Sequence, residues 1–395
     1  MAIFWQKNTP TKHLRLGAFR FPMIVTRFTW NIGARWKDRL VRDGRLRMTK
    51  RSAREPLRKR RGRNDLLVAA VMLVWVSAAA QTPPIPPPGK LVDLGGWRLH
   101  LNCTGRVSAS QPTVILEAGA GGFSVDWSLV QPEVARFTRV CSYDRAGLGW
   151  SDLGPRPRTL RQVTWELHTL LEKAGVRPPY VFVGQSYGGI LARLYAFTYP
   201  LEVGGMALVE SGHERGVAVL RNGQMVRLVE TANGSPIPEV KTSNPLRESD
   251  ITGNIRSQIE AAARQMAPHA TEPPYDKLPT DAQRMRVWSL SQVKHWATND
   301  NPFEGEELAA LLALQDKKRH PFGDMPLIVL SRGLREHEDQ ATEEEHNKNQ
   351  SALVALSSVG KQVIARRSGH EILITEPELV VAAIRDVATK KGSAK

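Results

Sequence analysis

The stretch of residues 181–189, VFVGQSYGG, constrains the fold of this chain more than any other. Three apolar residues, two of them β-branched, run into the pattern Gly-x-Ser-x-Gly, and residues 190–197 then read as a helix. A strand, a sharp turn and a helix in this order place the hydroxyl of Ser186 at the exposed tip of the turn. Glycine fits at positions 184 and 188 because a side chain there would collide within so tight a turn. The stretch therefore predicts that Ser186 is a nucleophile.

Short apolar segments alternate with helical ones along the rest of the chain. Residues 91–103 read as a hairpin around a Gly-Gly turn. Further strands are expected at residues 113–116, 138–143, 205–210, 326–330 and 362–365, and further helices at 159–174 and 376–389. This alternation predicts a mostly parallel sheet with helices on both faces, with the ligand site beyond the carboxyl ends of the strands. Four candidate parts of this site come just after the carboxyl end of an expected strand: the glycine-rich loop 119–122, Ser186, Glu210 and His370.

The formal charge of +16 belongs to the N-terminal residues. Residues 1–64 contain 19 Lys and Arg against 3 Asp and Glu, whereas the remaining chain has 36 of each kind. We expect residues 1–64 to be a disordered basic leader. Binding to nucleic acid depends on clustered positive charge, and the folded part is neutral, so no nucleic-acid partner is expected.

Residues 65–80 form an apolar segment behind this basic leader. The run is short for a bilayer span, which takes about 20 residues, and it suits a signal peptide cleaved after residue 80, or else an uncleaved anchor. A preface of 64 residues is long for a signal peptide, whereas a start at Met48 would leave a preface of ordinary length. Met48 is therefore an alternative to Met1 as the expected start of translation. The proline-rich residues 81–89 predict an extended spacer. We expect an exported protein, periplasmic or secreted, or one anchored to the membrane by residues 66–80, which would be its only membrane contact.

The regular alternation stops between residues 213 and 303. Residues 251–266 and 282–295 look helical and are separated by loops that contain proline. An insertion of about 90 residues is too long for a simple loop. We therefore expect a helical cap over the site at 213–303, and a core formed by residues 88–212 and 304–390. A peripheral decoration is the alternative.

Four motifs resemble those of the α/β-hydrolase fold superfamily, in its serine-nucleophile branch of esterases and lipases. They are LEAGAGG at 116–122, YDRAGLGWS at 143–151, GQSYG at 184–188 and SGH at 368–370, in the order that the superfamily shows. The resemblance implies an eight-stranded sheet of order 1-2-4-3-5-6-7-8 in which only the second strand is antiparallel. That order makes the strands with Cys103 and Cys141 neighbours, so these residues form either a disulfide or two buried thiols.

The resemblance also implies a triad for acyl transfer, which needs a nucleophile, a base and a group that orients the base. Ser186 is the expected nucleophile and His370 the base. The superfamily often has its acid after the seventh strand, where Asp339 and Glu336 are the alternatives. Some members have it after the sixth strand, and we prefer Glu210, which stands there.

The oxyanion donors implied by the resemblance are the backbone N–H groups of Ala120 and Tyr187. Position 118, where the superfamily commonly has histidine, is Ala118. Because the oxyanion donor is a backbone N–H group, this difference should not remove it. No His, Cys or Asp cluster has the spacing of metal ligands, so we expect neither a metal nor a cofactor.

The sequence thus predicts a serine hydrolase that acts through an acyl-enzyme on a small-molecule carboxylic ester, as an esterase, lipase or lactonase. Two alternatives stay open. One is a peptidase or C–C bond hydrolase of the same fold, because the cap selects the substrate. The other is an exported binding protein that has the fold without catalysis.

Overall fold

The computed structural model describes residues 85–108, 111–221, 224–298, 301–336 and 339–389. The basic leader and the apolar segment 65–80 lie outside these residues. Residues 85–89, the described part of the proline-rich spacer, have no helix or strand, and they contact the folded part. The indole N–H of Trp150 donates to the Ile85 carbonyl at 2.7 Å.

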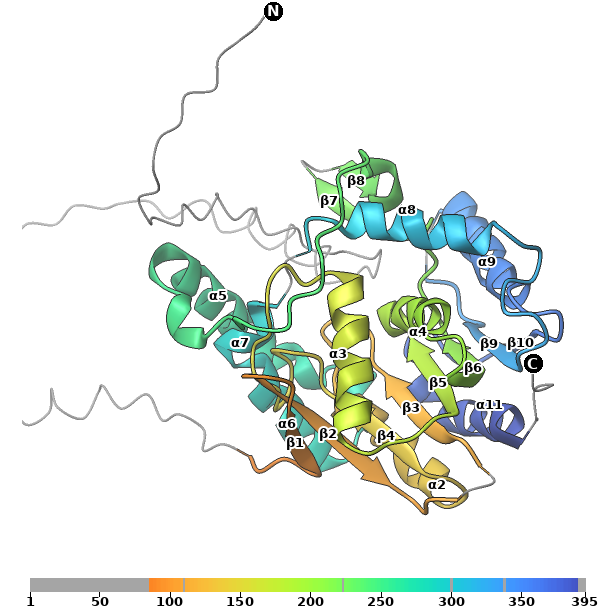
Figure 1. The fold of residues 1–395 in the computed structure, drawn as a ribbon, viewed down its shortest axis with the longest axis horizontal. Coiled ribbons are helices and arrows are strands. Elements are labelled where there is room, and N and C mark those ends of the chain that lie inside the picture. The colour runs from red at the N-terminus through yellow and green to blue at the C-terminus, as the bar shows by residue number, and fades with distance from the viewer. Residues whose placement is uncertain (1–84, 109–110, 222–223, 299–300, 337–338, 390–395) are drawn as a thin grey trace, which may run out of the picture.

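An eight-stranded sheet forms the centre of the molecule (Figure 1). Its strands are β1 (Lys90–Asp93), β2 (Arg98–Thr104), β3 (Thr113–Glu117), β4 (Val140–Tyr143), β5 (Tyr180–Gln185), β6 (Val203–Val209), β9 (Leu327–Arg332) and β10 (Lys361–Ala365). They are ordered β1-β2-β4-β3-β5-β6-β9-β10, and only β2 runs antiparallel to its neighbours. Both the predicted order and the predicted direction of the strands are confirmed.

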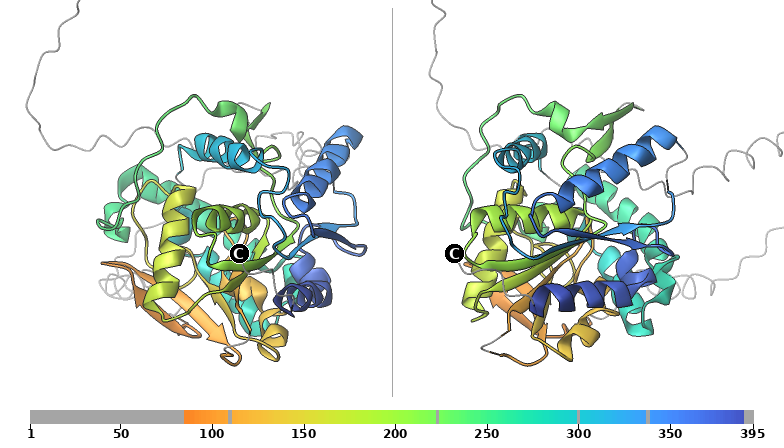
Figure 2. Two further views of the ribbon diagram at one scale, coloured as in Figure 1. Left: turned by 45° about the vertical axis from the view of Figure 1, so that its right-hand side comes forward. Right: turned by 90° about the vertical axis from the view of Figure 1, so that its right-hand side faces the viewer.

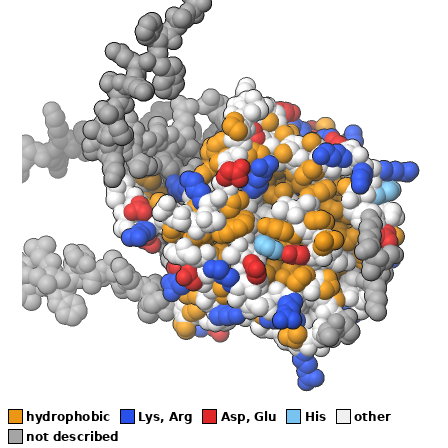
Figure 3. All heavy atoms as spheres, in the orientation of Figure 1, with side chains coloured by type: hydrophobic (Ala, Val, Ile, Leu, Met, Phe, Trp, Pro, Cys, Tyr) orange, Lys and Arg blue, Asp and Glu red, His pale blue; other side chains and the backbone are white. Residues whose placement is uncertain are grey.

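Helices cover both faces of this sheet (Figure 2). One face carries α3 (Leu160–Lys173), α4 (Tyr187–Thr198) and α9 (Gln340–Val354), and the other carries α2 (Gln131–Ala135), α10 (Ile372–Thr375) and α11 (Pro377–Thr389). Side chains alternate between the faces of a strand. Val181 and Val183 of β5 accordingly pack in the cluster with α11, while Phe182 packs in the cluster with α3 and α4. On the outer face that Figure 3 shows, charged side chains of both signs lie among hydrophobic ones.

Cys103 and Cys141 form a disulfide between β2 and β4. The two residues are paired directly across the antiparallel strands, with their Cα atoms 4.0 Å apart. The strand order that the sequence predicts makes them neighbours, and the register decides that they face each other.

The insertion between β6 and β9 differs from an all-helical cap. Its elements are β7 (Ala218–Arg221), β8 (Gln224–Arg227), α5 (Gly253–Met266), α6 (Thr280–Leu290), α7 (Val293–Trp296) and α8 (Glu304–Gln315), with short 3-10 turns at Leu228–Thr231, Glu248–Asp250, Ala267–Thr271 and Tyr275–Lys277. The strands β7 and β8 pair as an antiparallel hairpin beside α8 (Figure 1). Sequence analysis missed this hairpin because β8, QMVR, lacks an apolar alternation.

Candidate active site

Ser186 occupies the sharp turn between β5 and α4. Its φ of 53° is a left-handed value that is uncommon for a residue other than glycine, and such backbone strain gathers at functional sites. Backbone hydrogen bonds hold the turn: the Ser186 N–H donates to the Val209 carbonyl at 3.2 Å, and the Gly212 N–H donates to the Ser186 carbonyl at 2.9 Å. A Cβ at Gly188 would lie 2.6 Å from the Ala118 carbonyl oxygen, which explains the glycine there.

A cavity of about 340 Å³ opens beside this serine. Three strand ends meet in its wall, because Ser186 follows β5, Glu210 follows β6 and His370 follows β10. The insertion contributes Gly216, Val217, Ala218, Met225 and Arg227, and α9 contributes Thr342, Glu345, His346, Asn349 and Gln350. The hairpin therefore covers this cavity, and no residue of α5 or α6, the helices predicted from the sequence, is part of its wall.

His370 is buried, with 9% of its surface exposed. Its backbone N–H donates to a carboxylate oxygen of Glu336 at 2.8 Å, so this acid anchors the segment that carries the imidazole. Burial lowers the pKa of His370 to about 3, and the nearby negative charge of Glu210 opposes that shift only in part. The imidazole is therefore neutral at ordinary pH, which is the state that accepts a proton.

Glu210 lies at the end of β6 with a φ of 43°, the second left-handed residue in the cavity wall. Its Oε1 accepts from the Arg332 guanidinium at 2.7 Å and lies 2.9 Å from His346 Nε2. Its Oε2 accepts from the backbone N–H of Arg332 at 2.8 Å. Burial alone would raise the pKa of Glu210, but the hydrogen bond of His346 and the electrostatic interactions with His346, with His370 once it is protonated, and with Arg332 lower it to about 2.

The two alternative acids hold other positions. Asp339 is the N-cap of α9, where its carboxylate accepts from the backbone N–H of Thr342 at 2.8 Å. Glu336 contacts His370 through the backbone, as described above, and burial raises the pKa of its carboxyl. Glu210 is the carboxylate whose charge raises the pKa of His370, and His370 in turn lowers the pKa of Glu210.

Tyr187 and Ala120, the predicted oxyanion donors, flank the serine. Tyr187 is the first residue of α4, and the first N–H groups of a helix have no partner within the helix. Ala120 belongs to the glycine-rich loop after β3, and this loop abuts the elbow: a Cβ at Gly119 would lie 3.3 Å from Ser186 Cβ. The positive end of the α4 dipole adds to the attraction for an anion at this point.

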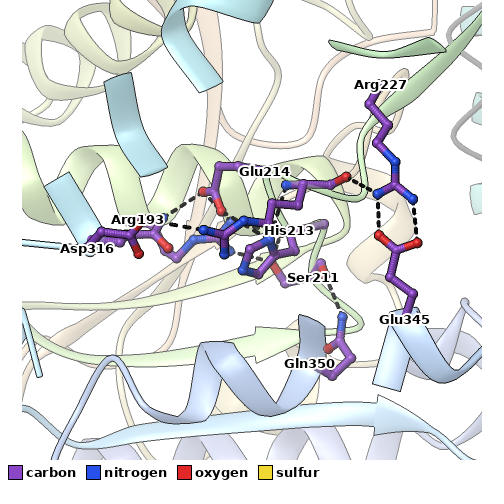
Figure 4. Close-up of polar contacts among 11 residues, drawn as sticks. Arg193, Ser211, His213, Glu214, Arg227, Asp316, Glu345 and Gln350 are labelled. Atoms are coloured by element: carbon purple, nitrogen blue, oxygen red, sulfur yellow. Dashed lines mark hydrogen bonds and ion pairs between the residues drawn. The ribbon is translucent and has the colours of Figure 1, made fainter. Parts of the chain in front are cut away.

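Further polar side chains surround the cavity beyond the predicted residues (Figure 4). Arg227 of β8 and Glu345 of α9 face each other and join through two hydrogen bonds. His213 lies beside the buried pair of Arg193 and Glu214, whose atoms are 2.7 Å apart. Burial lowers the pKa of His213 to about 4, so this side chain is neutral too.

Sequence reasoning missed Arg332 and His346, the two side chains that hold Glu210. Arg332 ends β9 and thus lies at the same edge of the sheet as Ser186, which is a signal that the sequence carries. His346 lies in the middle of a polar helix, where no pattern distinguishes it. In the described residues, no three or more His, Cys, Asp or Glu side chains are grouped as they would be to hold a metal ion. The described helices also include none with the length and apolarity to cross a membrane.

Comparisons with known proteins place this chain in a family. The profile of the Alpha/beta hydrolase family matches residues 114–383. An uncharacterized protein of Bacillus subtilis, YqjL, is 27% identical over 282 residues, which cover 71% of this chain and 85% of that protein. An AB hydrolase superfamily protein of Gibberella zeae is 26% identical over 296 residues, covering 71% and 88%.

Solved structures show the same fold. The chain is similar to Cfl2 from Burkholderia cenocepacia, with a TM-score of 0.52 and 18% identity over 76% of this chain and 95% of that one. It is also similar to the enol-lactonase from Burkholderia xenovorans, with a TM-score of 0.50 and 18% identity over 76% of this chain and all of that one. With its eight-stranded sheet and its serine elbow, and with more than half of its length matched by the family profile, this chain belongs to the alpha/beta hydrolase family and is a hydrolase.

Proposed function

We propose that the protein hydrolyses carboxylic esters through an acyl-enzyme, with Ser186 as nucleophile, His370 as base and Glu210 as the acid that orients it. The observation that carries the proposal is the meeting of these three side chains, from three separate strand ends, in the wall of one cavity. They come from three separate segments of the chain, and two of them adopt a strained left-handed backbone. Strain at two residues of the same cavity fits a site selected for function.

The chemistry follows from the charge states of these groups. The neutral His370 takes the proton of the Ser186 hydroxyl as the serine oxygen attacks the ester carbonyl. The Glu210 carboxylate, ionised because its pKa is about 2, stabilises the imidazolium that forms. The N–H groups of Tyr187 and Ala120 bind the oxyanion, and His370 then protonates the departing alcohol. A water molecule then attacks the acyl-enzyme carbonyl while His370 takes its proton. His370 returns this proton to the Ser186 oxygen, and the carboxylic acid is released.

The cavity supports a small ester. Its volume of about 340 Å³ is near the lower end of ligand sites, which range over about 300–1,000 Å³. Its wall combines apolar Val217, Ala218 and Met225 with charged groups that are already paired, such as Arg227 with Glu345. We infer that the group bound here is short and uncharged. The enol-lactonase among the solved structures cleaves an ester by its name, but that likeness concerns the fold alone.

A fluorophosphonate probe tests the nucleophile. The full chain should react with the probe, and Ser186→Ala should abolish the reaction. No labelling of the wild type would overturn the proposal and favour a binding protein of the same fold. Labelling that survives Ser186→Ala would also overturn it, because the nucleophile would then be another residue.

A series of p-nitrophenyl esters tests the substrate class. We expect kcat/KM to be highest for acetate to butyrate and to fall for longer acyl chains. Labelling by the probe without turnover of any ester would instead point to a peptidase or a C–C bond hydrolase.

Export remains part of the proposal. The Cys103–Cys141 disulfide supports it, because disulfides persist mainly in oxidising compartments. Fractionation of cells that make the full chain should find it outside the cytoplasm, and N-terminal sequencing should start at Gln81 if the apolar segment is cleaved. Recovery of uncleaved protein in the membrane fraction would indicate the anchor, and a soluble protein in the cytoplasm would contradict export.

A further inference from the structure

Arg145 is buried beneath the glycine-rich loop, with 8% of its side chain exposed. It follows β4 and belongs to the YDRAGLGWS motif, for which the triad has no use. Its guanidinium donates to a Glu117 oxygen at 2.5 Å and also to three loop carbonyls: Ala118 at 2.7 Å, Gly119, and Gly122 at 3.4 Å. One side chain thus holds the carbonyl groups on one side of the loop.

The bond to the Gly119 carbonyl fixes more than that oxygen. The C=O of Gly119 and the N–H of Ala120 belong to one planar peptide unit, which is trans, because the cis peptides of the described residues all precede proline. In a trans unit the C=O and the N–H point in opposite directions. When Arg145 draws the Gly119 carbonyl toward itself, the Ala120 N–H must point away from Arg145.

The loop also lies directly against the nucleophile. A Cβ at Gly119 would be 3.3 Å from Ser186 Cβ and closer still to Gln185 Oε1, so Gly119 packs directly against the elbow. The Gly122 N–H donates to the Gly119 carbonyl at 3.1 Å and holds the same oxygen from within the loop. This carbonyl therefore has two donors, and both favour one orientation of the peptide.

We infer that Arg145 is a positioning residue that sets the oxyanion hole by fixing the orientation of the Ala120 N–H. The inference rests on the proposed esterase function. Arginine suits this role because its planar fork makes several hydrogen bonds at fixed angles, which the single ammonium of lysine cannot match. Glu117 balances the buried charge and accepts from the Tyr143 hydroxyl as well.

The experiment compares four variants of the full chain on a p-nitrophenyl ester. Arg145→Met removes the guanidinium, and Arg145→Lys keeps only its charge. Glu117→Gln/Arg145→Met removes both charges, so it leaves no unpaired buried carboxylate. Arg158→Met is the matched control, because Arg158 and Glu166 form another buried pair, 2.6 Å apart, that makes no bond to the loop.

The readouts are kcat, KM and the inhibition constant of phenylboronic acid. Its boron forms a bond to the Ser186 oxygen while His370 takes the hydroxyl proton, and one boronate oxygen of the tetrahedral anion then lies in the oxyanion hole. We expect Arg145→Met and the double variant to lose about 10²–10³ in kcat with KM changed less than about threefold, and boronate affinity to weaken in parallel. Arg145→Lys should fall between these variants and the wild type, whereas Arg158→Met should lose stability but keep its boronate affinity.

Three results would overturn the inference. The first is a folded Arg145 variant whose kcat stays within about threefold of the wild type. The second is a loss of boronate affinity in Arg158→Met equal to that in the Arg145 variants. The third is a double variant that does not fold, because Arg145 would then serve stability alone. A wild type that is inactive and unlabelled by a fluorophosphonate would instead refute the proposed function itself.

Discussion

Arg332 holds both carboxylate oxygens of Glu210, its guanidinium lying 2.7 Å from Oε1 and its backbone N–H 2.8 Å from Oε2. The two residues end the neighbouring strands β9 and β6. β9 is the seventh strand of the sheet, after which the α/β-hydrolase superfamily often has its acid. Here the end of β9 supplies a cation that fixes a carboxylate on β6, so the acid that we propose and its anchor occupy adjacent strand ends.

Replacement of this acid should identify it. We expect Glu210→Gln to lower kcat by about 10³–10⁴, because the imidazolium formed during catalysis loses its negative partner. Asp339→Asn is the matched control, since asparagine caps a helix as well as aspartate does, and it should leave kcat within about threefold. A large loss in Asp339→Asn together with a small one in Glu210→Gln would assign the acid to Asp339.

The pH profile should report the buried base. The base must be neutral to act, so a lowered pKa for His370, about 3, moves the acid limb of kcat/KM below the ordinary histidine value of 6.5. Burial lowers this pKa most, the charge of Glu210 raises it, and the charges of Arg332 and His346 lower it further. Activity should stay level from pH 7 down to about pH 5. An acid limb centred near pH 6.5 would contradict this.

Glu304 on α8 should make stability depend on pH. Its carboxyl is buried, and in the described residues its Oε1 has no hydrogen-bond partner. Burial and the nearby Glu307 raise its pKa from 4.5 to about 7. The folded state therefore holds this proton more tightly than the unfolded state does, and stability falls as pH rises from about 4.5 to 7.

Glu304→Gln should remove this dependence. We expect the variant to gain up to ~3 kcal/mol in free energy of unfolding at pH 8 and little at pH 5, measured by urea unfolding. Glu306→Gln, on the same helix, is the control and should change stability little at either pH. An equal effect of Glu304→Gln at both pH values would contradict the prediction.

The disulfide should add to stability. Cys103 and Cys141 are 38 residues apart, and closing a loop of that length restricts the unfolded chain. We expect Cys103→Ala/Cys141→Ala to lower the free energy of unfolding by about 2–4 kcal/mol. A maleimide should label the denatured wild type only after reduction. Labelling before reduction would show that the thiols are free.

The sequence was informative where chemistry and secondary structure share a short pattern. Ser186 could be found because its turn needs glycine at 184 and 188, and the strands because buried parallel strands read as apolar runs. The hairpin β7–β8 and the side chains of Arg332 and His346 could not be found. Their positions depend on which distant segments pack together, and the local sequence of α9 or β8 does not indicate that packing.

By itself the sequence determined the elbow and the set of candidate acids, and its resemblance to the superfamily implied the order of the sheet. Only the tertiary structure showed which groups hold Glu210, which residues line the cavity, and which carbonyls Arg145 holds. The reason is physical: a strand or a tight turn is specified by neighbours along the chain. A carboxylate's partner or a peptide's orientation is specified instead by hydrogen bonds between residues such as Glu210 and Arg332, which are 122 positions apart.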